Sequence, residues 1–177
     1  MQSVSRLAVG AAYWLIVHRN IRIKLCCIVQ VVFEIPVRIY HEDTDGGGIV
    51  YYANYLKFME RARTEYLRSL GFEQDELRQQ HNCIFVVTHV DIAYKRPATF
   101  NDRLTVSCEL LEMRRASFRV RQNIHKTEDT VEGAVNAQCY PGALLTASTV
   151  SLACLHSETL APHRIPAKLS EVLADEH

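Results

Sequence analysis

Two aspartates stand beside three consecutive glycines in the stretch from residue 38 to residue 55. Asp43 and Asp45 precede the glycines at 46–48, and a helical pattern begins a few residues later. Glycine permits backbone dihedral angles that are closed to other residues, and it lets the backbone approach a ligand closely. The start of a helix offers unpaired N–H groups and a positive dipole end, which suit an oxygen that becomes negative. A carboxylate beside such amides indicates a site for attack on a carbonyl group.

Each of these residues also has an ordinary structural interpretation. An aspartate next to glycines is commonly a turn or capping residue, which is the role expected of Asp43. Position alone would favour the same role for Asp45. The glycines do not form a nucleotide-binding loop, because no Gly-x-x-x-x-Gly-Lys follows them. His41 could carry a proton, but a single histidine at a strand end is more often simply hydrogen-bonded.

One long helix and a series of strands must hold this turn. Over Asn54–Leu70, apolar side chains recur at spacings of three and four residues, which predicts a helix that Gly71 ends. A short second helix is expected over 73–80. Alternation of apolar residues predicts strands at 34–42, 83–96, 103–112, 116–125, 143–155 and, less regularly, 130–140. Strands in succession around one long helix are typical of an α+β fold with an antiparallel sheet.

The same alternation predicts which side chains of the strands face the core. They are Ile84, Val86, Val90, Ile92 and Tyr94, then Leu104, Val106, Cys108 and Leu110, then Phe118, Val120 and Ile124. Thr88 interrupts the first of these faces, and Cys83, Cys108 and Cys154 are expected in the core. A single helix covers only one face of a curled sheet, so the other face or the sheet edge needs a partner, which predicts at least a dimer. The segment after His156 is expected to pack loosely.

The composition excludes several classes of function. The 177 residues include twenty basic and twenty acidic side chains, so the net charge gives no indication of nucleic-acid or membrane-surface binding. The six cysteines lack a Cys-x-x-Cys spacing and no histidines cluster with them, which argues against a metal site. They favour buried thiols in a reducing, cytoplasmic compartment. With 48% hydrophobic residues, the chain suffices for one domain with a substantial core.

The first 33 residues differ from the rest, because they contain basic residues and no acidic residue before Glu34. Their two apolar runs are shorter than the about 18–20 residues that a membrane-spanning helix needs. Targeting, or membrane association through residues 1–33 alone, is one interpretation. An appended, poorly ordered segment is the interpretation that we favour. The expected division is therefore an extension at 1–33, a domain at 34–170 and a tail at 171–177.

The stretch around the aspartates belongs to a longer series of motifs. The series is Arg38-Ile39, Thr44-Asp45, Gly48-Ile49-Val50, Asn54-Tyr55, Glu60-Arg61-Ala62-Arg63, Tyr94, Pro97-Ala98, Asp102, Leu104, Arg115, Ser117-Phe118 and His163-Arg164-Ile165-Pro166. It resembles the 4-hydroxybenzoyl-CoA thioesterase-like hot-dog family, and most closely the acyl-CoA thioesterases encoded with the bacterial Tol–Pal cell-envelope system. The resemblance covers roughly residues 34–170 and is specific, because separated motifs occur in the right order.

Two positions depart from the pattern of the Tol–Pal subgroup. Tyr52 stands where that subgroup usually has histidine, whereas tyrosine there is the pattern of the 4-hydroxybenzoyl branch. Residues 129–142 look longer than the usual hairpin of the family. The first departure concerns the substrate class and leaves the general chemistry unchanged.

The resemblance implies a hot-dog fold, in which a curled antiparallel sheet of about five or six strands wraps one long central helix. It implies hydrolysis of an acyl-CoA thioester to free acid and CoA, with Asp45 as nucleophile or general base. The backbone N–H of Tyr52 would face the thioester oxygen. Substrate binding is assigned to Gly48, Val50, Tyr55, Lys95, Arg96 and Arg115, the last three as candidate ligands of the phosphates of coenzyme A.

The implied enzyme needs no cofactor, because coenzyme A is part of its substrate. It is expected to be a homodimer or homotetramer in the cytoplasm or at the inner-membrane surface. One alternative is a non-catalytic hot-dog module that binds an acyl carrier protein or an envelope complex. Another is a dehydratase or hydratase, against which the lack of a histidine between Gly46 and Gln80 argues. Another hot-dog branch takes its catalytic carboxylate from the long helix, but here Glu60 and Glu65 are expected on a solvated face or as partners in pairs along the helix.

Overall fold

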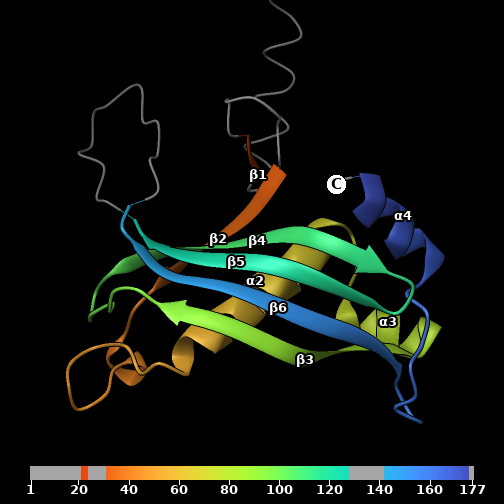
Figure 1. Cartoon of the computed structure of the whole chain (residues 1–177), viewed down its shortest axis with the longest axis horizontal. Helices are drawn as coiled ribbons and strands as arrows, with labels where there is room; N and C mark the ends of the chain where they lie inside the picture. The colour runs from red at the N-terminus through yellow and green to blue at the C-terminus, as the bar shows by residue number, and fades with distance from the viewer. Residues whose placement is uncertain (1–20, 24–30, 128–141, 176–177) are drawn as a thin grey trace, which may run out of the picture.

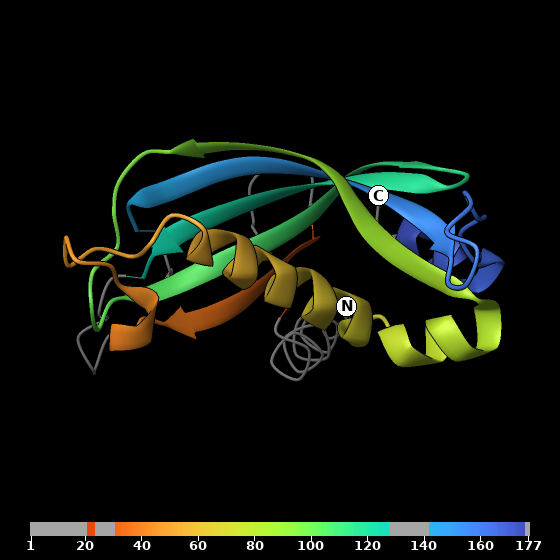
Figure 2. The same cartoon turned by 90° about the horizontal axis from the view of Figure 1, so that it is seen from below.

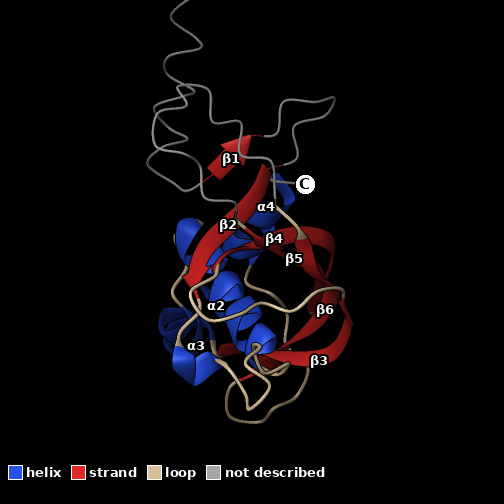
Figure 3. Cartoon of the chain, turned by 90° about the vertical axis from the view of Figure 1, so that its left-hand side faces the viewer, coloured by secondary structure: helices blue, strands red, loops and turns tan. Residues whose placement is uncertain are grey.

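A curled antiparallel sheet wraps around one long helix in the computed structural model, which describes residues 21–23, 31–127 and 142–175 (Figure 3). The described strands are β1 (Ile21–Ile23), β2 (Val31–Arg38), β3 (Cys83–Tyr94), β4 (Arg103–Arg114), β5 (Ser117–Lys126) and β6 (Leu144–His156). They form a six-stranded sheet in the order β1-β2-β4-β5-β6-β3 (Figure 1). The helical elements are the 3₁₀ turn η1 (His41–Asp43), α2 (Asn54–Ser69), α3 (Gln74–His81) and α4 (Ala167–Asp175). The predicted α+β hot-dog architecture is confirmed.

Helix α2 lies diagonally across the concave face of the sheet (Figure 2). The stripe that the spacing predicted is buried at Tyr55, Phe58, Met59, Ala62 and Tyr66. Fully burying one such large apolar side chain contributes about 1.5–3 kcal/mol, so this stripe holds the helix in place. None of the described helices is long and apolar enough to cross a membrane.

The core-facing residues of β4 and β5 are those that the alternation predicted, since all seven are buried. In β3 the prediction is right at Val90 and Ile92, which pack partly buried against the core, whereas Tyr94 at the strand end is 45% exposed. Phe85 and Val87 lie opposite the buried Cys154 and Leu152 of β6. A register shift at Thr88 then places Val90 on the same inner face. One extra residue in a strand reverses the alternation, so Ile84 and Val86 point outward, contrary to the prediction.

The chain ends differ most from the sequence-based expectations. Strand β2 begins at Val31 and pairs with β1, so the first strand starts three residues before the predicted boundary at residue 34. The first strand also ends earlier than predicted, at Arg38, because η1 follows it. The predicted strand at 130–140 lies outside the described residues.

The prediction that the segment after His156 packs loosely is wrong. Helix α4 inserts Leu169 and Leu173 into the core at 0% and 1% exposure. Pro166 directly precedes this helix, and its carbonyl accepts the N–H of Ser170. Proline is well suited to a helix start because its φ angle is already fixed near the helical value. This proline therefore marks the beginning of a packed helix, which includes most of the predicted tail.

Candidate active site

The turn between β2 and α2 is closed by hydrogen bonds to and from Asp45. Its N–H donates to the carbonyl of Ile49 over 2.9 Å, and its carbonyl accepts the N–H of Gly48 over 2.9 Å. One carboxylate oxygen, Oδ1, accepts the N–H of Gly47 over 2.8 Å. Gly48 has a φ angle of 74°, in the left-handed region that favours glycine. The glycines thus permit a tight turn that holds an exposed carboxylate by one of its two oxygens.

Asp43 connects this turn to the start of the helix. Its Oδ2 accepts the N–H of Tyr40 over 2.9 Å. Its carbonyl accepts both the N–H of Tyr51 and the side-chain amide of Asn54, over 2.9 and 3.0 Å. Asn54 is the first residue of α2 and is buried. These contacts hold the turn and join it to α2, which agrees with the structural role predicted for Asp43.

Tyr52 lies between the glycine turn and the first residue of α2. Its backbone N–H has no hydrogen-bond acceptor among the described residues, as expected for a group that precedes the first helical turn. Its carbonyl accepts the hydroxyl of Tyr94 over 3.1 Å, which ties the helix start to the end of β3. The Tyr52 side chain is 60% exposed. The backbone amide, rather than the phenol, is therefore the group held in a fixed position.

Sequence reasoning gave Tyr94 no role at the site, although it belongs to the motif series. Burial raises the pKa of its phenol, and the neighbouring Tyr52 acts in the same direction. Tyr94 consequently remains protonated and able to donate its hydrogen bond. A side-chain hydrogen bond with Tyr52 likewise raises the pKa of Tyr51, and the charge of Asp45 is a smaller cause. Tyr51 is thus the phenol that senses the charge of Asp45, and Tyr94 contacts Tyr52.

Val50 and Tyr55 both form hydrogen bonds to the backbone of Ala98, in the loop after β3. The N–H of Val50 donates to the carbonyl of Ala98 over 2.9 Å, and the hydroxyl of Tyr55 accepts the N–H of Ala98 over 2.9 Å. Both side chains are buried, at 3% and 2% exposure. These two residues fasten the Asp45 turn to the loop after β3, and their predicted contact with substrate stays a prediction.

The basic residues assigned to coenzyme A lie at two ends of the sheet. Lys95 and Arg96 are exposed directly after β3, and their backbone N–H groups donate to the carbonyl of Leu145. This is the end of the sheet where the Asp45 turn lies (Figure 1). Arg115 is exposed in the turn between β4 and β5, at the opposite end. Within one chain, Lys95 and Arg96 are therefore near the turn, whereas Arg115 is not.

Comparison with known proteins matches this geometry to one family. The sequence profile of the thioesterase superfamily matches residues 47–132. The acyl-CoA thioesterase YbgC of Haemophilus influenzae is 36% identical over 137 residues, which are 77% of this chain and 90% of that protein. The chain belongs to the thioesterase superfamily. The acyl-CoA thioester hydrolase YbgC of Escherichia coli is also 36% identical, over 77% of this chain and 92% of that protein.

A solved structure agrees with the sequence relatives. The probable thioesterase of Bartonella henselae superposes with a TM-score of 0.64 at 31% identity, covering 76% of this chain and 99% of that one. The resemblance to hot-dog thioesterases, which the motifs indicated, is confirmed. Among the residues that the structure describes, no group of three His, Cys, Asp or Glu side chains could hold a metal ion.

This thioesterase also contains a cavity that the sequence did not indicate. The cavity has a volume of about 120 Å³ and lies between α2, α3 and the inner face of the sheet. Most of its lining is apolar and includes Leu67, Phe85, Val87, Leu110, Phe118 and Leu152. The register shift in β3 brings Phe85 and Val87 to this face, which explains why simple alternation could not predict the cavity.

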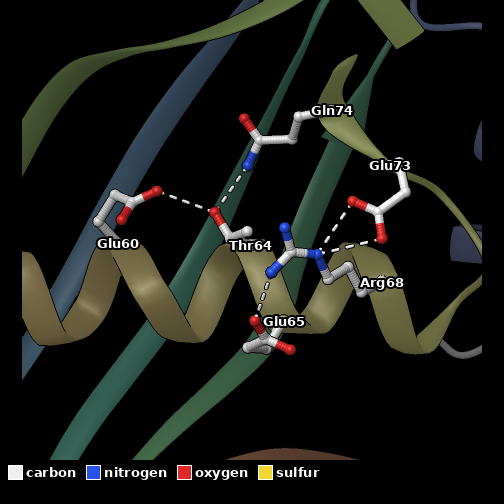
Figure 4. Close-up of polar contacts among 6 residues, drawn as sticks. All are labelled: Glu60, Thr64, Glu65, Arg68, Glu73 and Gln74. Atoms are coloured by element: carbon white, nitrogen blue, oxygen red, sulfur yellow. Dashed lines mark hydrogen bonds and ion pairs between the residues drawn. The ribbon is translucent and has the colours of Figure 1, made fainter. Parts of the chain in front are cut away.

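Polar side chains line the cavity beside α2. Gln74 Nε2 donates to Thr64 Oγ1 over 2.7 Å, and that hydroxyl donates to Glu60 Oε1 over 2.8 Å (Figure 4). Arg68 instead pairs with Glu65 and Glu73, over 2.6 and 3.0 Å, on the exposed side of the helix. Exposed pairs of this kind contribute little to stability. Glu65 therefore belongs to the solvated face, as predicted, whereas the hydrogen bond of Glu60 lies at the edge of the cavity.

Proposed function

We propose that this protein hydrolyses acyl-CoA thioesters at the Asp45 turn. The observation that carries the proposal is that one segment between β2 and α2 holds both an exposed Asp45 carboxylate and the Tyr52 amide, which has no acceptor among the described residues. The names of the two YbgC relatives support coenzyme A thioesters as the substrate class. Exposed Lys95 and Arg96 near the turn suit the phosphates of coenzyme A, because charge-assisted hydrogen bonds to phosphate are strong.

The chemistry follows from where negative charge develops. As the thioester carbonyl is attacked, its oxygen becomes negative, and a fixed N–H donor stabilises it by about 3 kcal/mol in comparable sites. Asp45 either attacks the carbonyl carbon directly or removes a proton from an attacking water. Direct attack forms a mixed anhydride and expels the CoA thiolate, after which water releases the acid. Both routes give the same products and need the same placement of Asp45 and Tyr52.

A complete site would need a second copy of the chain. Strand β3 is an edge of the described sheet and is twelve residues long, and long edges readily pair with another strand. Antiparallel pairing of two β3 strands would place the Tyr94 end of one beside the Cys83 end of the other. The Asp45 turn of one copy would then lie at the end of the other copy that holds the cavity and Arg115. This arrangement would bring Arg115 to the same site as Lys95 and Arg96.

In this arrangement the cavity receives the acyl group. An apolar cavity of about 150 Å³ suffices for one benzene molecule, so about 120 Å³ suits a short acyl chain or a single aromatic ring. The non-catalytic alternative, a module that binds an acyl carrier protein, would use the same surfaces without turnover. Cytoplasmic location, association with an envelope complex and membrane contact through residues 1–33 stay predictions.

A panel of acyl-CoA thioesters with release of free CoA thiol as the readout tests the proposed function. We expect turnover to be highest for acyl groups of about five carbons or one aromatic ring and to fall for long chains. Absence of turnover across the whole panel would favour the binding-module alternative. Sedimentation analysis tests the shared site, because a monomer with full activity would contradict it.

Deletion of the leading residues tests their contribution separately. A deletion of residues 2–20 leaves β1 and the buried Phe33 of β2 in place. We expect unchanged turnover and unchanged solubility. Loss of membrane association in cell fractionation after this deletion would show that the leading residues are a targeting or anchoring segment.

A further inference from the structure

Arg63 places a guanidinium in the wall of the cavity. Its Nη1 donates to Gln122 Oε1 over 2.7 Å, and Gln122 Nε2 donates to the carbonyl of Met59 over 3.0 Å. Gln122 is fully buried on β5. The guanidinium is thus held between helix and sheet by a neutral partner.

The charge of Arg63 has no carboxylate partner in the described part of the chain. None of the salt bridges there includes it. Glu60 shares the cavity wall, but it is exposed and its carboxylate accepts the hydroxyl of Thr64. Burial lowers the pKa of Arg63, while Cys108 and Glu60 act in the opposite direction. A guanidinium still remains protonated and carries five N–H donors, of which Gln122 takes one.

We infer that Arg63 is a specificity residue, and that the cavity takes acyl groups carrying a carboxylate at the end distant from the thioester. This inference rests on the proposed thioesterase function and names the acyl class. A partly buried cation with spare donors gains more from an anionic acceptor than from an alkyl chain, which would leave the donors unpaired. The apolar lining contacts the methylene groups, and the guanidinium binds the terminal carboxylate.

The volume of the cavity limits the length of such an acyl group. About 120 Å³ suits a chain of about five carbons. Glutaryl-CoA and pentanoyl-CoA form a matched pair, because they differ only by a terminal carboxylate in place of a methyl group. The ratio of their kcat/KM values therefore isolates recognition at the far end of the acyl chain.

The test compares this ratio in the full-length wild type and in R63M. We expect the wild type to prefer glutaryl-CoA, and the ratio to fall about tenfold or more in R63M, the size typical of a lost hydrogen bond to a charged group. R63K keeps the charge but loses the planar fork, so its ratio should be intermediate. R61M is the matched control, since Arg61 is exposed, lies over the ring of Phe58 and does not line the cavity; its ratio should equal that of the wild type.

The outcomes separate this inference from the proposed function. If the wild type hydrolyses pentanoyl-CoA at least as well as glutaryl-CoA, the inference is overturned while the thioesterase function stands. A folded R63M with the wild-type ratio overturns it too. If the wild type hydrolyses no acyl-CoA at all, the proposed function itself fails. Should R63M not fold, the wild-type preference and the intermediate ratio of R63K decide the question.

Discussion

Gln122 links the long helix to the sheet from a fully buried position, and Q122L tests that link. The substitution removes the hydrogen bond to the Met59 carbonyl and the bond from Arg63. A neutral hydrogen bond contributes about 0.5–1.5 kcal/mol and one to a charged group about 1.5–3 kcal/mol. Burial of the leucine offsets about 1 kcal/mol of this loss. We therefore expect the free energy of unfolding to fall by about 1–3.5 kcal/mol, which corresponds to a melting temperature lower by about 2–14 °C.

Urea unfolding measures this loss, with wild type and variants compared at one protein concentration, because the predicted dimer would make stability depend on concentration. Q74L is the matched control: Gln74 is exposed and donates one hydrogen bond, to Thr64, so its substitution should change the unfolding free energy by less than about 0.5 kcal/mol. The double variant Q122L/R63M should lose less than the sum of the two single variants, because both partners are removed together. Additive losses, or a Q122L protein as stable as the wild type, would refute the reasoning.

Three further predictions concern the turn, the last helix and a buried thiol. G48A should lose about 1–2 kcal/mol in thermal unfolding through backbone strain alone, because φ is positive and an added Cβ meets nothing within 4 Å. G46A, equally open and without a positive φ, should be close to neutral. L169A should lose about 2–5 kcal/mol in urea unfolding, since Leu169 is fully buried in α4, and a negligible loss would contradict the packing of that helix. Burial raises the pKa of Cys108 to about 12 from an ordinary 9.0, so the folded chain keeps a proton that the unfolded chain loses above pH 9. The free energy of unfolding should therefore fall between pH 9 and pH 12, by up to about 1.4 kcal/mol per pH unit from this thiol. In C108A the free energy of unfolding should fall less steeply over the same pH range.

The elements with an unbroken period could be predicted from the sequence alone. Helix α2, β4 as far as Leu110 and β5 as far as Ile124 follow their patterns because one face of each is buried over those residues, and register shifts come only after them. The inner face of β3 could be predicted only in part, since the bulge at Thr88 is set by pairing with β6. Helix α4 was missed because it is short and its few leucines are buried by contacts with residues far away in the sequence.

The parts of the site built from contacts between neighbouring residues could also be predicted, whereas the parts built from distant contacts could not. The turn around Asp45 and Asp43 is built from contacts among neighbouring residues, so turn chemistry indicated it. Tyr94 reaches the Tyr52 carbonyl across 42 positions, and Gln122 meets the Met59 carbonyl across 63. Such contacts depend on which strand ends meet in the folded sheet, and periodicity carries no information about them.

Asp45 is the residue on which the proposed chemistry depends, and D45N is its most direct test. Asparagine retains an oxygen that can accept the N–H of Gly47, so the turn should persist. Removing the catalytic carboxylate should lower kcat for the best acyl-CoA substrate by about 10²–10⁴-fold. D43N is the matched control, because it changes the carboxylate that accepts the Tyr40 N–H. In this variant kcat should fall by less than about threefold. A folded D45N protein that releases CoA at the wild-type rate would contradict the assignment of Asp45 as nucleophile or general base.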